Sequence, residues 1–396
     1  MPSKKELNSN IWKYYAAGIL QSLWFILAIN ILYWQSFGIT YGQIGMFELV
    51  GALAIILLEI PTGAVADLVS RKMSVFIGVV IAATANFIIG FGSTLFVFAT
   101  AYVVWAIGDT FISGAKSALI YDTLKDLKKE KEYMKIQGRY HLYTTFALIF
   151  ATAVSPFLFA INRRIPYILL GIAWLISSVF ILKMTEPSRR ASKYSIKKHI
   201  IQMKEGFNYS ITHKMIRWYF LFSILIGLPM VLYNDLISQS YYINVGYSLS
   251  HLAILIPVIY GSASFVASQA HKIENKFGEN KSLMIIALLH ALGFIFMGIL
   301  KIPFVIAFVI LLYLSRDFRW VVMDNYVNKH VTSKMRATVI SVGSMLTFAV
   351  MVVMYPLAGK LMDIFGIFTV LLGFGIFVVL SSILLFAIKP RLITVD

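Results

Sequence analysis

The sequence predicts an all-α membrane protein whose twelve transmembrane helices form two pseudo-symmetric six-helix bundles. Of its 396 residues, 59% are hydrophobic and only 13% are charged. Soluble domains, by contrast, are about 45–50% apolar and about 25% charged. The apolar residues gather in blocks of the roughly 20 residues that a bilayer-spanning helix requires. A polar stretch at the middle of the chain separates the first six blocks from the last six.

The boundaries of the twelve spans follow from these blocks. Turn-forming or charged residues mark the breaks, as in Asn162-Arg163-Arg164 and from Asp363 to Gly366. The first apolar block runs past Tyr33, which is too long for the core of a signal peptide, so we expect a retained first span. The predicted spans are 12–35, 42–66, 73–91, 95–122, 139–161, 165–184, 215–243, 250–270, 282–300, 303–328, 337–359 and 366–388.

The distribution of basic residues predicts the orientation. About 30 of the 35 Lys and Arg residues fall in loops on one side of the predicted membrane, and cytoplasmic loops are the ones that collect such residues. The opposite loops contain only Arg163, Arg164, Lys301 and Lys360. We therefore expect a multi-pass protein of the cell membrane with both termini in the cytoplasm. The net charge of +17 has the same explanation, so no nucleic-acid partner is expected.

The two halves of the chain resemble each other. An offset of 208 residues places Asp109 on Asp317 and Lys116 on Asp324. Two halves of like order are typical of many secondary transporters. We predict an N-terminal bundle at residues 1–184, a basic cytoplasmic linker at 185–214 and a C-terminal bundle at 215–396. A short basic helix against lipid headgroups is one interpretation of the linker, and a solvated segment is the alternative.

The loop after the second span carries a recognisable motif. It follows the pattern Gly-x-x-x-Asp-Arg-x-Gly-Arg-Arg/Lys at Gly63, Asp67, Arg71 and Lys72. Leu68 and Ser70 depart from the pattern. The chain thereby resembles the major facilitator superfamily, a resemblance that extends to span number, linker and order. Three further segments are similar to its drug:proton antiporter, multidrug-efflux-like branch: Leu58 to Gly63, Ser113 to Asp122 and Arg336 to Ser341.

This motif predicts a cytoplasmic gate. A carboxylate at Asp67 can face either Arg71 or the positive N-terminal end of another helix. The resemblance implies that this helix is the eleventh span, which begins near Arg336. Ordinary interfacial charges that obey the positive-inside rule are the alternative. The predicted gate residues are Gly63, Asp67, Arg71, Lys72 and Arg336.

Charged residues inside the spans are candidates for proton coupling. A charge at mid-bilayer costs about 2.5–3.5 kcal/mol on insertion scales, so it is expected to face a partner or a watery cavity. Asp109 is the first candidate, because no basic residue lies within one turn of it in the sequence and removal from water favours the protonated carboxyl. Asp235 and Glu59 are the others.

The resemblance implies that spans one, four, seven and ten line a central cavity, and most of the intramembrane charges fall on these spans. The alternative is a structural salt bridge, for example between Asp317 and either Arg316 or Arg319. The substrate-cavity candidates are Gln21, Asn30, Lys116, Asn234, Gln239, Arg316, Asp317 and Asp324.

These features favour a proton-coupled exporter of amphipathic small molecules that works by alternating access. Ala151, Ser155 and Pro156 resemble a degraded antiporter signature and favour export. The alternatives are a proton-coupled nutrient importer and a non-transporting sensor or lipid-handling protein. No phosphate-binding loop or metal-ligand spacing is present, so we expect no enzyme, cofactor or metal. The expected partners of a monomeric chain are a small-molecule substrate, protons and the lipid bilayer.

Overall fold

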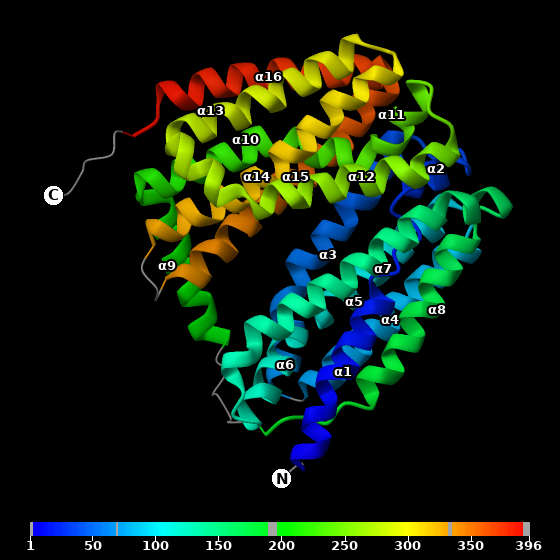
Figure 1. The fold of residues 1–396 in the computed structure, drawn as a ribbon, viewed down its shortest axis with the longest axis vertical. Coiled ribbons are helices and arrows are strands. Elements are labelled where there is room, and N and C mark those ends of the chain that lie inside the picture. Colours follow the sequence, from blue (N-terminus) through cyan, green and yellow to red (C-terminus); the bar gives the residue numbers. More distant parts are fainter. Residues whose placement is uncertain (1–2, 69, 189–195, 332–334, 391–396) are drawn as a thin grey trace. The chain divides into compact units, whose positions relative to one another are not determined.

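The computed structural model describes residues 3–68, 70–188, 196–331 and 335–390, and for 59–60, 63–68, 196–200, 202 and 337 it describes the backbone only. All regular structure in these residues is helical (Figure 1). Ten helices among them are long and apolar enough to cross a membrane. An all-α polytopic fold is therefore confirmed.

The chain forms two compact units. The first comprises Met1–Ile39 and Met46–Ile196, and the second comprises Thr40–Gly45 and Lys197–Asp396. The first six predicted spans correspond to α1 (Lys4–Gln21), α2 (Asn30–Gln35), α3 (Tyr41–Leu68), α4 (Arg71–Phe91), α5 (Leu95–Ile112), α6 (Ala115–Asp126), η1 (Glu130–Glu132), α7 (Tyr133–Ile161) and α8 (Ile165–Leu182). The remaining elements are α9 (Ile196–Thr212), α10 (Lys214–Leu236), α11 (Ser238–Asn244), α12 (Leu249–Ser268), α13 (Ala270–Ile299), η2 (Pro303–Val305), α14 (Ile306–Lys329), α15 (Arg336–Phe365) and α16 (Ile367–Ala387).

The first predicted span is not one continuous helix, so that prediction is wrong. Helix α1 ends at Gln21, and α2 begins only at Asn30. The Phe25 carbonyl in the gap accepts a hydrogen bond from the Ser155 hydroxyl on α7. Irregular backbone is tolerated at membrane depth where protein groups satisfy it. The partner lies 130 residues away in the chain, so no local sequence pattern reveals the break.

Two other differences affect the positions of charges. Helix α14 is not among the ten apolar spans, because Arg316, Asp317 and Arg319 interrupt its apolar sequence. Helix α15 continues past the predicted end at residue 359 to Phe365 and stops where Gly366 takes a φ of 77°. Lys360 and Asp363, which were predicted in or at an outer loop, therefore lie in the last turns of a helix.

The two units repeat the same packing. In the first, α4 packs against α5 and α8, and in the second α13 packs against α14 and α16 (Figure 1). Small residues permit both approaches. A Cβ on Gly78 of α4 would lie 2.5 Å from the Gly108 carbonyl oxygen of α5. A Cβ on Gly298 of α13 would lie 2.6 Å from the Leu372 nitrogen of α16.

Helix α9, which lies in the predicted linker, is part of the second unit and packs against α15. A Cβ on Gly206 would lie 2.4 Å from Cγ2 of Thr338 on α15. The Tyr209 hydroxyl donates to the His330 carbonyl at 3.0 Å. These contacts attach part of the basic segment to the ends of α14 and α15.

Candidate functional site

An asparagine–aspartate pair on α10 connects four helices of the second unit. The Asn234 amide oxygen accepts hydrogen bonds from the hydroxyls of Tyr260 on α12 and Tyr313 on α14, each at 2.9 Å. Its amide nitrogen donates to the neighbouring Asp235 carboxylate at 2.9 Å. The other oxygen of Asp235 accepts from the Tyr355 hydroxyl on α15 at 2.6 Å. A change at this one pair therefore affects α10, α12, α14 and α15 together.

Arg316 lies beside this cluster. Its guanidinium carbon is 4.5 Å from the centre of the Tyr313 ring and 5.2 Å from that of Tyr260, within the range of cation–π attraction. Its Nε donates to Asp317 at 2.7 Å. Arg316 and Asp317 thus neutralise each other, as in the salt bridge considered as the alternative to a substrate role.

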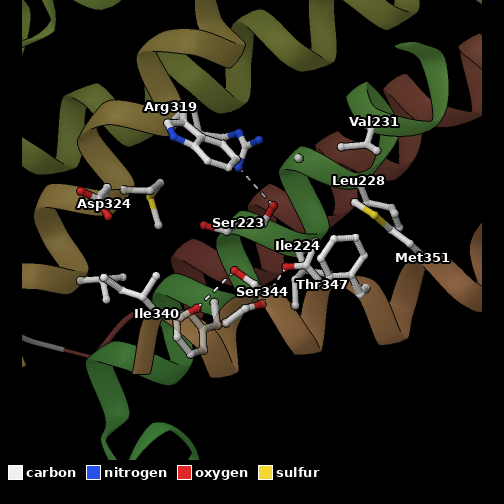
Figure 2. Close-up of a pocket in the computed structure, with 17 residues that line it drawn as sticks. Ser223, Ile224, Leu228, Val231, Arg319, Asp324, Ile340, Ser344, Thr347 and Met351 are labelled. Atoms are coloured by element: carbon white, nitrogen blue, oxygen red, sulfur yellow. Dashed lines mark hydrogen bonds between the residues drawn. The ribbon is translucent and has the colours of Figure 1, made fainter. Parts of the chain in front are cut away.

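Helices α10, α14 and α15 line a partly open cavity of about 350 Å³ (Figure 2). Its walls are mostly apolar, with aliphatic, aromatic and methionine side chains from all three helices. Few polar side chains reach it, and they include two charges of opposite sign. The polar lining residues are Ser223, Arg319, Asp324, Ser344 and Thr347.

Arg319 is the buried charge of this cavity, with 8% of its surface exposed. It lies directly against α10, where a Cβ on Gly227 would be 2.7 Å from the guanidinium carbon. Its Nη1 donates to the Ser223 carbonyl at 3.3 Å, the bond drawn from Arg319 in Figure 2. Its Nε has no acceptor among the residues that the structure describes. The sequence suggested only that Arg319 pairs with Asp317. The three charges close together on this span were the one sign in the sequence that Arg319 belongs to a functional site.

Asp324 differs from Arg319 in its exposure. It is exposed, and its carboxylate accepts a hydrogen bond from the Asn328 amide at 3.1 Å. Of the predicted cavity residues in this unit, Asp324 lines the cavity, whereas Asn234, Arg316 and Asp317 form the adjacent polar cluster. Gln239 is buried on α11.

In the first unit, two predicted cavity residues come together. The Lys116 ammonium on α6 donates to the Gln21 side-chain oxygen at 2.5 Å and to the Tyr140 hydroxyl at 2.7 Å. Tyr140 stacks on Tyr14 with ring centres 4.4 Å apart. Asn30 is instead hydrogen-bonded to Tyr167 on α8. This unit therefore holds its intramembrane cation with neutral oxygens and aromatic rings.

The coupling candidates of the first unit are less fully defined. Asp109 is half-buried in the last turn of α5, next to the break between α5 and α6. The side chain of Glu59 lies outside the described residues. Within the described chain, no group of three or more His, Cys, Asp or Glu residues could hold a metal ion.

The sequence matches the family model described as Major Facilitator Superfamily over residues 15–316. The chain belongs to the major facilitator superfamily. It is 22% identical over 387 residues to an uncharacterized MFS-type transporter, YxaM, of Bacillus subtilis (strain 168), a match that covers 95% of this chain and 93% of that protein. The protein is therefore a membrane-embedded, multi-pass transporter.

Solved structures agree on the superfamily fold. The nucleoside transporter NupG has a TM-score of 0.80 at 15% identity, covering 97% of this chain and 99% of that one. A bacterial homologue of the human lysosomal transporter Spinster, in an inward-facing and unoccupied conformation, has a TM-score of 0.76 at 14% identity, covering 97% and 96%. A D-xylose–proton symporter has a TM-score of 0.73 at 12% identity, covering 97% and 98%. Such low identities establish the fold and leave the solute open.

The superfamily loop motif is described only in part. Gly63 and Asp67 lie on α3, but their side chains are outside the described residues, so the predicted contact of Asp67 is not defined. Arg71 forms an ion pair with Asp122 on α6 and donates to the Ala118 carbonyl at 3.1 Å. Sequence reasoning did not assign Asp122 to this pair.

The two other predicted gate residues lie at helix starts. The Lys72 backbone N–H donates to Glu186 at 2.9 Å, and Glu186 also accepts from the Arg71 backbone at 3.0 Å, so it caps α4. Arg336 is exposed at the first residue of α15. Glu186 follows the sixth span, more than a hundred residues from α4, which explains why the sequence did not indicate this cap.

Proposed function

We propose that this transporter is a proton-coupled exporter of amphipathic small molecules that works by alternating access. The observation that carries the proposal is the mostly apolar cavity of α10, α14 and α15, with a hydrogen-bonded carboxylate at Asp235 one helical turn beyond the lining residue Val231. Small-molecule sites are typically apolar with a few polar groups that fix orientation. Apolar walls accommodate the body of an amphipathic solute, and the adjacent carboxylate is a site for the driving proton.

Asp235 is a candidate coupling group because its protonation changes contacts made by the cavity helices. As a carboxylate it accepts hydrogen bonds from Asn234 on α10 and Tyr355 on α15. A proton converts one oxygen into a donor, so one of these bonds must rearrange. Asp109 remains the candidate in the first unit. Either group has to be reached from both sides of the membrane in turn.

The direction of transport rests on the sequence. The antiporter-like residues Ala151, Ser155 and Pro156 and the branch-like segments favour export. Import is the second candidate, since a D-xylose–proton symporter is among the proteins of the same fold.

Proteoliposomes test coupling and direction in one experiment. The purified protein is reconstituted, and uptake of 8-anilinonaphthalene-1-sulfonate and of rhodamine 6G is followed under pH gradients of either sign. Proton antiport accumulates solute when the lumen is acidic, because protons leave as solute enters. Protein-free liposomes and nigericin-treated proteoliposomes correct for passive distribution. Uptake that occurs only when the exterior is acidic would show proton symport and contradict export. Uptake that nigericin leaves unchanged would show that transport is not coupled to protons.

A further inference from the structure

Among the described residues, no carboxylate contacts the buried guanidinium of Arg319 directly, and the nearby Asp317 is already paired with Arg316. On α14, Arg316 and Asp317 form an ion pair at 2.7 Å, which leaves Arg319 as the remaining buried charge of this turn. Among the described residues, Arg319 forms no ion pair, and its single hydrogen bond is the 3.3 Å contact with the Ser223 carbonyl. A buried charge is strongly unfavourable unless it is paired and hydrogen-bonded.

The packing around Arg319 places its guanidinium at the cavity wall. Gly227 provides the space for the guanidinium, because any Cβ at that position would lie 2.7 Å from its carbon and one of its nitrogens. Arg319 is itself part of the cavity lining, and its Nε is buried without an acceptor in the described chain. A guanidinium presents several N–H donors in a fixed plane that matches a carboxylate, sulfonate or phosphate.

The rest of the cavity lining is mostly apolar and carries one negative charge. Among the described residues, Asp324 is the only acidic residue that lines the cavity, and it is exposed whereas Arg319 is buried. Exposed charges are screened more strongly than buried ones, so Asp324 offsets the charge of Arg319 less than a buried carboxylate would. The buried surroundings of the solute are thus electrostatically positive and otherwise mostly apolar.

We propose that this cavity selects amphipathic anions, with Arg319 binding the acidic group of the solute and acting as the residue that determines charge specificity. This inference rests on the proposed function, because it takes the molecule bound in the cavity to be the transported solute. The bound anion supplies the direct ion-pair partner that Arg319 does not have among the described residues, while the apolar walls contact the hydrophobic body of the solute. A cavity of about 350 Å³ restricts the site to a small solute.

The test uses three probes that share one apolar ring system and differ in charge. Naphthalene-2-sulfonate, 2-naphthylmethanol and 2-naphthylmethylammonium are titrated calorimetrically into the full-length protein in a neutral detergent. We expect the anion to bind at least tenfold more tightly than the cation, because a hydrogen bond between two charged groups is roughly twice as strong as one between neutral groups. Equal binding of anion and cation by the wild type would overturn the proposal.

Substitutions at two positions, with opposite expected effects on the preference for the anion, keep the test independent of folding. Arg319→Gln should abolish the preference for the anion, and Arg319→Lys should retain part of it. Asp324→Asn, at an exposed position, should increase the ratio of anion to cation affinity about two- to threefold, as expected for a screened charge. An unchanged ratio in Asp324→Asn, or a preserved preference in Arg319→Gln, contradicts the proposal. Binding requires no pH gradient, so failure of coupled export and failure of anion selection are separate results.

Discussion

At the scale of single residues, intramembrane charges are stabilised in two ways, by hydrogen bonds to neutral groups or by an ion pair. Lys116 is surrounded by neutral acceptors, the Gln21 amide and the Tyr140 hydroxyl. Asp235 is also held by neutral groups, Asn234 and Tyr355, but these come from two cavity helices. Among the described residues the Asp235 carboxylate forms no direct ion pair, although the Arg316 guanidinium beside the cluster attracts it. Asp317, which is paired with Arg316, is the contrasting case.

Substitution of Asp235 or Asp109, two of the three coupling candidates, should separate coupling from binding. We expect Asp235→Asn to abolish pH-gradient-driven accumulation while solute exchange remains measurable. The amide keeps the shape of the side chain but cannot take up and release a proton as a carboxylate does. The sequence makes the same prediction for Asp109→Asn. Each variant is measured in proteoliposomes with and without the gradient.

Asp317→Asn is the matched control, since loss of its ion pair should reduce folding or binding and not coupling alone. A variant that accumulates solute at the wild-type rate under the gradient excludes its residue as the coupling site. Retention of that rate by both variants would exclude both candidates.

At the scale of elements, α15 is longer than predicted and its last turns fix the start of α3. The Asp363 carboxylate accepts from the backbone N–H groups of Tyr41 and Gly42 at 2.9 and 2.8 Å. Negative charge at a helix N-terminus is favourable because the free N–H groups carry partial positive charge. Two glycines permit the close approach. A Cβ on Gly45 would lie 2.4 Å from the Tyr355 carbonyl oxygen, and a Cβ on Gly359 would lie 2.3 Å from that of Tyr41.

Removal of this cap should release the first turn of α3. The chain contains no cysteine, so Ile44→Cys introduces a single thiol at a buried position of that turn. Loss of a capping side chain costs about 1 kcal/mol, so we expect Asp363→Ala to increase the rate of maleimide labelling about fivefold. Asp363→Asn is the control and should have a smaller effect, because asparagine still accepts hydrogen bonds. Identical labelling rates in all three backgrounds would show that Asp363 does not hold the turn.

At the scale of the whole molecule, the internal repeat of the sequence corresponds to a repeat of packing. Helix α4 with α5 and α8 has the same place in the first unit as α13 with α14 and α16 in the second. The repeated order explains why Asp109 and Asp317 occur at equivalent positions. Their surroundings nevertheless differ, since Asp317 has an arginine next to it in the sequence and Asp109 does not.

The predicted orientation is tested with topology reporters. A reporter fused after Lys204, in the basic segment that includes α9, should read cytoplasmic, because cytoplasmic loops collect Lys and Arg. A reporter inserted at Gly92, between α4 and α5, should read external. Alkaline phosphatase and green fluorescent protein fusions provide complementary readouts. A reversed reading at either site would contradict the orientation and the twelve-span order.

The candidate site could be predicted only in part. Polar residues in apolar spans stand out in any sequence, so Asn234, Asp235, Lys116 and Asp324 were identifiable. Their partners were not, because Tyr260, Tyr313 and Tyr355 are common residue types spread over about a hundred positions. Arg319 was visible as a charge, but its burial against Gly227 depends on how α10 and α14 pack.

The sequence by itself determined the all-α polytopic class, the order of the apolar spans and the superfamily, because apolar length and local motifs carry that information. Tertiary structure alone decided the break after Gln21, the cap of α4 by Glu186 and the cavity around Arg319. Each of these depends on a polar group that is satisfied, or left unsatisfied, by a residue distant in the chain. Local patterns cannot encode such pairings, because the groups meet only after the helices have packed.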